Sequence, residues 1–146
     1  MKKAVIITVL SILSTSTILA QNWLTDFSVA KALASKENKP IILVFQGSDW
    51  CGPCIKLDRE IWTTKEFKAF ANNNYVMLKA DFPRKKKNEL SLAQKEANAK
   101  LAERYNKNGI FPFVVVLDEN GTKLGETGYK KTSPDNYIKE LNSMIN

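Results

Sequence analysis

Three apolar stretches rich in branched side chains constrain the fold of this chain more than any other feature. Residues 41–45 form a continuous apolar run, and residues 75–81 and 110–117 form two less regular ones. Such runs are typical of strands that are covered on both faces. The segments between them carry apolar residues three and four apart, which predicts helices. The sequence therefore predicts an α/β fold with a central mixed β-sheet flanked by helices.

The expected order of elements is helix, strand, helix, strand, helix, strand, strand, helix. A turn at residues 118–121 separates the last two strands, so we expect them to be antiparallel neighbours. No repeat or linker interrupts this order, and a single domain accounts for every segment. The predicted helices cover residues 22–36, 51–61, 89–108 and 134–145, and a further helical stretch at residues 64–74 follows the second of them. The predicted strands cover residues 41–45, 75–81, 110–117 and 122–127.

The first twenty residues have the order of a secretory signal peptide. Lys2 and Lys3 precede an apolar segment at residues 4–13 and a polar one at 14–17, and we predict cleavage after Ala20. An uncleaved anchor is the alternative, but the apolar segment is shorter than the roughly 20 residues that span a bilayer. We therefore expect a signal peptide at residues 1–20, a domain at 21–146, and export, with a Gram-negative periplasm favoured over the outside medium.

A basic excess characterises the chain, which has a formal net charge of +7. Four basic residues follow one another at residues 84–87. Such a run can attract an acidic partner, nucleic acid or an anionic lipid surface. Because the run contains no interleaved aromatic residues and no nucleic-acid motif accompanies it, we predict a solvated loop and no nucleic-acid partner.

The chain has two cysteines, and both lie in Trp50-Cys51-Gly52-Pro53-Cys54. A disulfide between them closes so small a loop that it stabilises the fold little, so the pair predicts redox chemistry. In the first turn of a helix both thiols lie on one face, with Cys51 at the helix end as the attacking thiolate and Cys54 as the resolving thiol. A zinc half-site is the alternative. The chain has no His and no further Cys, so we expect no metal and no cofactor.

The region around the cysteines resembles the thioredoxin superfamily. Residues 50–54 match the active-site motif of that family, and residues 109–113 look like the segment that carries its cis-proline. The longer form at residues 47–51 is more similar to exported bacterial thioredoxin-like proteins. The resemblance implies a thioredoxin-like fold and a cis bond before Pro112. It also implies substrate contacts at Trp50, Gly52, Pro53, Phe111 and Pro112.

Two residues depart from the pattern of the family. Phe45 stands where thioredoxins carry a buried Asp that assists proton transfer from the second cysteine. Asp49, another carboxylate or water must then take this role, or exchange is slower. Phe111 stands before the proline, where a smaller aliphatic residue or Thr is more usual. This ring is expected to alter the substrate groove and the redox potential.

The resemblance also predicts the function. Gly52 and Pro53 between the cysteines are similar to the reducing members of the family, so we expect an enzyme that reduces disulfides of exported proteins. Its partners would be protein thiols and disulfides and a membrane protein that donates electrons. One alternative is a disulfide oxidase or isomerase. Another is a non-catalytic binding or chaperone module that uses the groove near Pro112.

Overall fold

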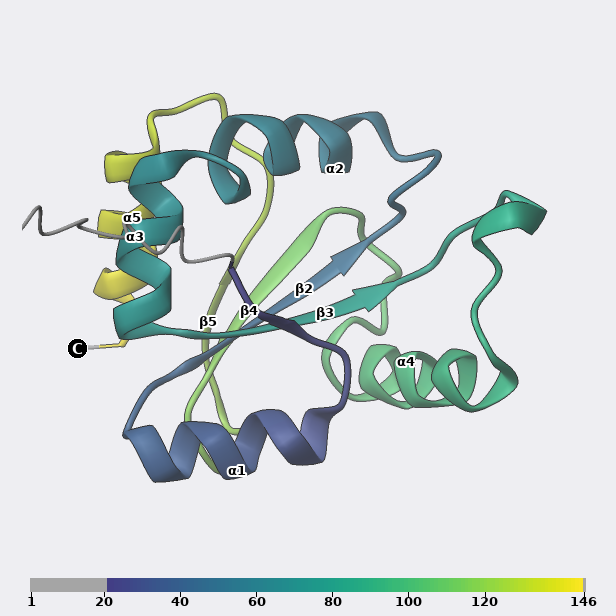
Figure 1. The fold of residues 1–146 in the computed structure, drawn as a ribbon, viewed down its shortest axis with the longest axis horizontal. Helices are drawn as coiled ribbons and strands as arrows, with labels where there is room; N and C mark the ends of the chain where they lie inside the picture. The colour runs from purple at the N-terminus through teal and green to yellow at the C-terminus, as the bar shows by residue number, and fades with distance from the viewer. Residues whose placement is uncertain (1–20, 146) are drawn as a thin grey trace, which may run out of the picture.

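The computed structural model describes residues 21–145, and the predicted signal peptide at residues 1–20 lies outside the described residues. A five-stranded sheet forms the centre, with strand order β1-β3-β2-β4-β5 (Figure 1). Strand β3 pairs in parallel with β1 and β2, whereas β4 pairs antiparallel with β2 and β5. The predicted α/β class and mixed sheet are confirmed. The strands are Trp23–Leu24 (β1), Ile41–Gln46 (β2), Val76–Asp81 (β3), Phe113–Leu117 (β4) and Lys123–Thr127 (β5).

Each of the five α-helices in residues 21–145 begins after a side chain that accepts a hydrogen bond from the backbone of the first turn. Such caps satisfy N–H groups that have no partner within the helix. A one-turn π-helix at Asp58–Trp62 continues α2. Every helix within residues 21–145 is too short or too polar to cross a membrane. The helices are Phe27–Glu37 (α1), Gly52–Leu57 (α2), Lys65–Asn74 (α3), Leu92–Tyr105 (α4) and Pro134–Ser143 (α5), capped by Asp26, Cys51, Thr64, Ser91 and Ser133.

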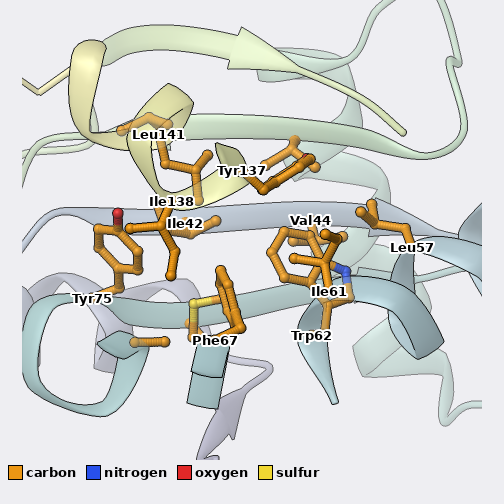
Figure 2. Close-up of a cluster of buried hydrophobic side chains, with 14 residues drawn as sticks. Ile42, Val44, Leu57, Ile61, Trp62, Phe67, Tyr75, Tyr137, Ile138 and Leu141 are labelled. Atoms are coloured by element: carbon orange, nitrogen blue, oxygen red, sulfur yellow. The ribbon is translucent and has the colours of Figure 1, made fainter. Parts of the chain in front are cut away.

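Strand β2 lies between two hydrophobic cores. Ile42 and Val44 face the core under α2, α3 and α5, which Figure 2 shows with Leu57, Trp62 and Tyr137 gathered around them. Ile41, Leu43 and Phe45 face the opposite core, under α1 and α4. Because neighbouring residues of a strand point to opposite faces, a strand covered on both sides is apolar throughout. This explains the unbroken run at residues 41–45.

The first helix begins later than predicted. Residues 22–26 were expected to be helical, but Trp23 and Leu24 pair with Met77 and Leu78 of β3. Asp26 then caps α1 through the N–H groups of Ser28 and Val29. A two-residue strand is too short to show alternation, and the apolar spacing of this segment fits a helix equally well.

Two further boundaries also differ from the predictions. Strand β4 begins at Phe113, three residues after the predicted start, because Pro112 has no N–H to donate to a neighbouring strand. Helix α4 begins at Leu92 instead of residue 89, because Ser91 accepts the capping hydrogen bond from Gln94. The segment before it includes a short 3-10 turn at Lys86–Asn88 within the predicted basic loop.

Candidate redox site

The two cysteines lie at the junction of β2 and α2, as predicted. They form a disulfide, with their Cα atoms 5.2 Å apart. Cys51 is the N-cap of α2, and its Sγ accepts a hydrogen bond from the backbone N–H of Cys54 at 3.3 Å. Each cysteine is only 4% exposed, whereas Gly52 and Pro53 between them are exposed. Gly52 and Pro53 are therefore the exposed part of the motif.

Trp50, the residue before Cys51, is held on several sides. Its indole Nε1 donates a hydrogen bond to the backbone oxygen of Phe82 at 2.7 Å. Its ring meets Phe111 edge to face, with the centroids 5.5 Å apart, and lies directly against Gly47. The guanidinium carbon of Arg84 lies 3.7 Å from the ring centroid. Trp50 is therefore a fixed, half-buried part of the site.

The proline segment meets the cysteine motif through aromatic rings. The bond between Phe111 and Pro112 is cis, as the family resemblance implied. The ring of Phe111 contacts Trp50 and also Phe82, whose centroid is 5.4 Å away. Because Trp50 precedes Cys51 and Phe111 precedes Pro112, this contact brings the two motifs together. The roles of Gly52, Pro53 and Pro112 in substrate binding stay predictions.

Asn106 holds the segment that leads to the cis bond, a role that the sequence did not reveal. Its Nδ2 donates to the backbone oxygen of Ile110 at 2.9 Å, and its Oδ1 accepts from the N–H of Ile110 at the same distance. Asn106 is only 4% exposed. A buried amide that satisfies both polar groups of one residue fixes the backbone there. The one sequence feature that could have indicated this role is the position of Asn106 at the end of a helix, just before the proline segment.

Asp49 fastens the basic loop to the active-site turn. Its carboxylate accepts hydrogen bonds from the backbone N–H of Arg84 at 2.9 Å and of Lys85 at 3.0 Å. The side chain of Asn88 donates a third bond at 2.8 Å. The bond from Arg84 and those from Asn88 and Lys85 lower the pKa of Asp49. A carboxylate with a lowered pKa is a weak proton acceptor, so Asp49 is poorly suited to replace the missing base.

Asp81 makes a second connection between the same two segments. It accepts hydrogen bonds from the backbone N–H of Ser48 at 2.9 Å and from the hydroxyl of Ser48 at 2.6 Å. The buried side chain of Asn98 donates to the backbone oxygen of Asp81 at 2.8 Å. The ends of β2 and β3 are therefore joined by side chains as well as by the sheet.

Phe45 belongs to β2 and Asp58 follows α2, the two elements that flank the cysteine pair. Phe45 is fully buried and packs against Phe113, so no carboxylate occupies that place. Asp58 lies one helical turn after Cys54, and its N–H donates to the backbone oxygen of Cys54. Partial loss of water raises the pKa of Asp58, although Lys79 and Lys68 act in the opposite direction. Residues four apart on a helix lie on the same face, so Asp58 and Cys54 share one face at the end of α2.

A metal site would need ligands in addition to the two cysteine sulfurs. The sulfurs are bonded to each other. In the part of the chain that the structure describes, residues 21–145, no group of three or more His, Cys, Asp or Glu side chains is placed to hold a metal ion.

Comparison with known proteins gives similarities over most of the chain. A family model described as thioredoxin-like matches residues 22–119. The disulfide bond reductase DsbH of Chlamydia pneumoniae is 36% identical over 120 residues, which are 81% of this chain and 70% of that protein. The thioredoxin-related protein DsbJ of the same organism is 24% identical over 73% of this chain and 30% of that protein. A solved structure of a DsbH oxidoreductase superposes with a TM-score of 0.77 and 31% identity, covering 92% of this chain and 93% of that one.

Proposed function

Since this chain belongs to the thioredoxin-like family, we propose that it is a thiol–disulfide oxidoreductase that reduces disulfides of exported proteins through Cys51 and Cys54. One observation carries the proposal. The N–H of Cys54 donates to the Sγ of Cys51 at the first turn of a helix. In the reduced protein the same donor stabilises a thiolate at Cys51, and the thiolate is the form that attacks disulfides.

The reaction proceeds in two exchanges. The Cys51 thiolate attacks one sulfur of the substrate disulfide, which forms a mixed disulfide and releases the other substrate sulfur as a thiolate that takes up a proton. Cys54 then loses its proton and attacks the Sγ of Cys51. The Cys51–Cys54 disulfide forms, and the second substrate thiolate leaves. Two electrons pass from the cysteine pair to the substrate.

We propose that Asp58 accepts the proton of Cys54 in the second exchange, in place of the carboxylate that Phe45 lacks. Two features support this role. Asp58 is one turn from Cys54 on the same helix, and its raised pKa brings the carboxyl closer to the range in which it exchanges protons at neutral pH. Asp58 is exposed, so a proton taken from Cys54 passes readily to water.

The reducing direction is supported by two observations. Gly52 and Pro53 resemble the residues between the cysteines of reducing thioredoxins. The relative that is 36% identical is described as a disulfide bond reductase. The proposed export through residues 1–20 places the protein in an oxidising compartment, where a membrane protein must return two electrons and two protons to the pair after each turnover.

Insulin reduction and a trapping experiment test the proposal. Wild type should reduce insulin with dithiothreitol as the donor, and Cys51→Ser should not exceed the rate of dithiothreitol alone. Equal rates for both proteins would favour the non-catalytic binding module. Cys54→Ser should accumulate mixed disulfides on Cys51, which mass spectrometry of periplasmic extracts would identify.

The redox potential separates the reductase from its nearest alternative. A disulfide oxidase or isomerase would have a Cys51–Cys54 potential near those of oxidising proteins, at about −120 to −180 mV. The potential of a reductase should be close to that of thioredoxin, at about −270 mV. A measured potential above about −180 mV would refute the reducing direction and leave the exchange chemistry in place.

A further inference from the structure

The basic loop lies beside the redox pair, although about 30 residues separate them in the sequence. Strands β2 and β3 are parallel, so their ends meet at one edge of the sheet. The turn at residues 47–50 follows β2, and the segment with residues 84–87 follows β3. Figure 1 shows this segment projecting at the same end of the sheet as the turn that leads into α2. We name the side chains of Arg84, Lys85, Lys86 and Lys87 the basic rim.

Hydrogen bonds to the backbone fix the rim in place. The Asp49 carboxylate accepts hydrogen bonds from the backbone N–H groups of Arg84 and Lys85. The Asp81 carboxylate accepts one from the N–H of Ser48. The loop and the active-site turn are therefore joined at two points. The four rim side chains are exposed. Within residues 21–145 none of them forms an ion pair with a carboxylate at 4.0 Å or less. The loop is solvated, as predicted, but its backbone is fixed relative to the active-site turn.

Arg84 brings the rim to the residue that precedes Cys51. Its guanidinium lies over the ring of Trp50 at 3.7 Å. Trp50 is bonded to Cys51, and consecutive Cα atoms are about 3.8 Å apart. A substrate segment that places a disulfide sulfur against Cys51 therefore has its neighbouring residues within reach of the rim.

We propose that the basic rim binds acidic residues next to the reactive disulfide of a partner protein and so selects acidic substrates for Cys51. This proposal rests on the proposed thiol–disulfide exchange. Charge complementarity favours an acidic protein segment. Nucleic acid fits less well, because single strands need aromatic faces for stacking, and Arg84 already covers a face of Trp50.

The rim acts on the encounter between the two proteins. Exposed charges change association rates more than the final affinity, and salt screens them beyond about 8 Å at physiological ionic strength. The rim should therefore raise the rate of mixed disulfide formation with an acidic partner at low salt. It should leave the intrinsic chemistry of the cysteines unchanged.

Two disulfide peptides of one length test this inference. They share the same cystine core and differ only in flanking residues, which are Asp and Glu in one and Lys and Arg in the other. Stopped-flow mixing with the dithiol protein at 20 mM and 500 mM salt gives the second-order rates. The rim variant Lys85→Gln/Lys86→Gln/Lys87→Gln keeps the backbone bonds to Asp49. A matched control, Lys36→Gln/Lys65→Gln/Lys139→Gln, removes three exposed lysines from α1, α3 and α5.

Wild type should reduce the acidic peptide at least fivefold faster than the basic one at low salt. The rim variant should lose most of this ratio, the control variant should keep it, and 500 mM salt should abolish it. Exchange with no charge preference in wild type, or an equal loss for both peptides in the rim variant, would overturn the proposal and leave the reductase function intact. No exchange with either peptide would overturn both. Rim-dependent binding of a single-stranded oligonucleotide without any peptide preference would assign the rim to nucleic acid instead.

Discussion

The indole ring of Trp50 lies so close to Gly47 that a β-carbon at Gly47 would come within 2.2 Å of its Cε2 atom. Contacts this short do not occur, so the ring or the backbone would have to move. The indole N–H also donates a hydrogen bond to the backbone oxygen of Phe82, and the ring packs against Phe111 and Arg84. Gly47 is therefore required for the close approach of Trp50 to the turn that carries Cys51.

Gly47→Ala should displace Trp50 and weaken the site. Overpacking of this kind costs about 1–3 kcal/mol of unfolding free energy, and urea denaturation will measure it. The indole N–H resonance of Trp50 should shift as its bond to Phe82 breaks. Gly52→Ala is the control for stability, because a β-carbon at Gly52 meets no atom within 4 Å. Equal stability of the two variants would contradict the close contact at Gly47.

The pH dependence of the loop should follow Asp49. Hydrogen bonds from Arg84, Asn88 and Lys85 hold the pKa of Asp49 below its ordinary value of 3.8. A lowered pKa means that Asp49 stabilises the folded loop above the unfolded pKa, and that this contribution is lost as the pH falls through the folded pKa. The amide resonances of Arg84 and Lys85 should therefore titrate with a midpoint below 3.8. In Asp49→Asn this titration should disappear, and a midpoint at or above 3.8 in wild type would refute the assignment.

Asp58→Asn should slow the second exchange without unfolding the protein. The raised pKa of Asp58 means that folding disfavours its charged form, so Asn at this place should not lower stability at pH 7. General bases contribute about 10²–10⁴-fold, and because Asp58 is exposed we expect a smaller loss of about tenfold. Single-turnover release of the second substrate thiol, followed from pH 5 to 9, measures it. Glu60→Gln is the control, because Glu60 is bonded to Tyr129 and Arg59 instead. Equal rates of the second exchange in wild type and Asp58→Asn would mean that water, and not Asp58, accepts the proton of Cys54.

The sequence predicted the features that depend on neighbouring residues, but it did not predict the contacts between segments that are distant in the chain. The strand before Cys51, the helix after it and the cis bond before Pro112 follow from neighbouring residues and a family motif, and they are confirmed. The bonds from Asp49 to Arg84 and Lys85 join residues 35 and 36 positions apart. They depend on which strands are neighbours in the sheet, and that order is not encoded in either segment alone. The basic loop could therefore be recognised as solvated but not placed beside the cysteines.

Asn106→Ala should loosen the segment before the cis-proline. It removes both hydrogen bonds to Ile110, and unsatisfied buried groups cost about 1–3 kcal/mol each. Ile110 is 47% exposed, so water can replace part of the lost bonds. We therefore expect a loss of about 2–4 kcal/mol in unfolding free energy, measured by urea denaturation. Asn73→Ala removes one exposed bond to Ala69 and should cost about 0.5 kcal/mol or less. If Asn106 also positions the substrate groove through Ile110 and Phe111, the variant should raise KM for insulin more than it lowers kcat. An unchanged KM together with the stability loss would restrict Asn106 to a role in folding.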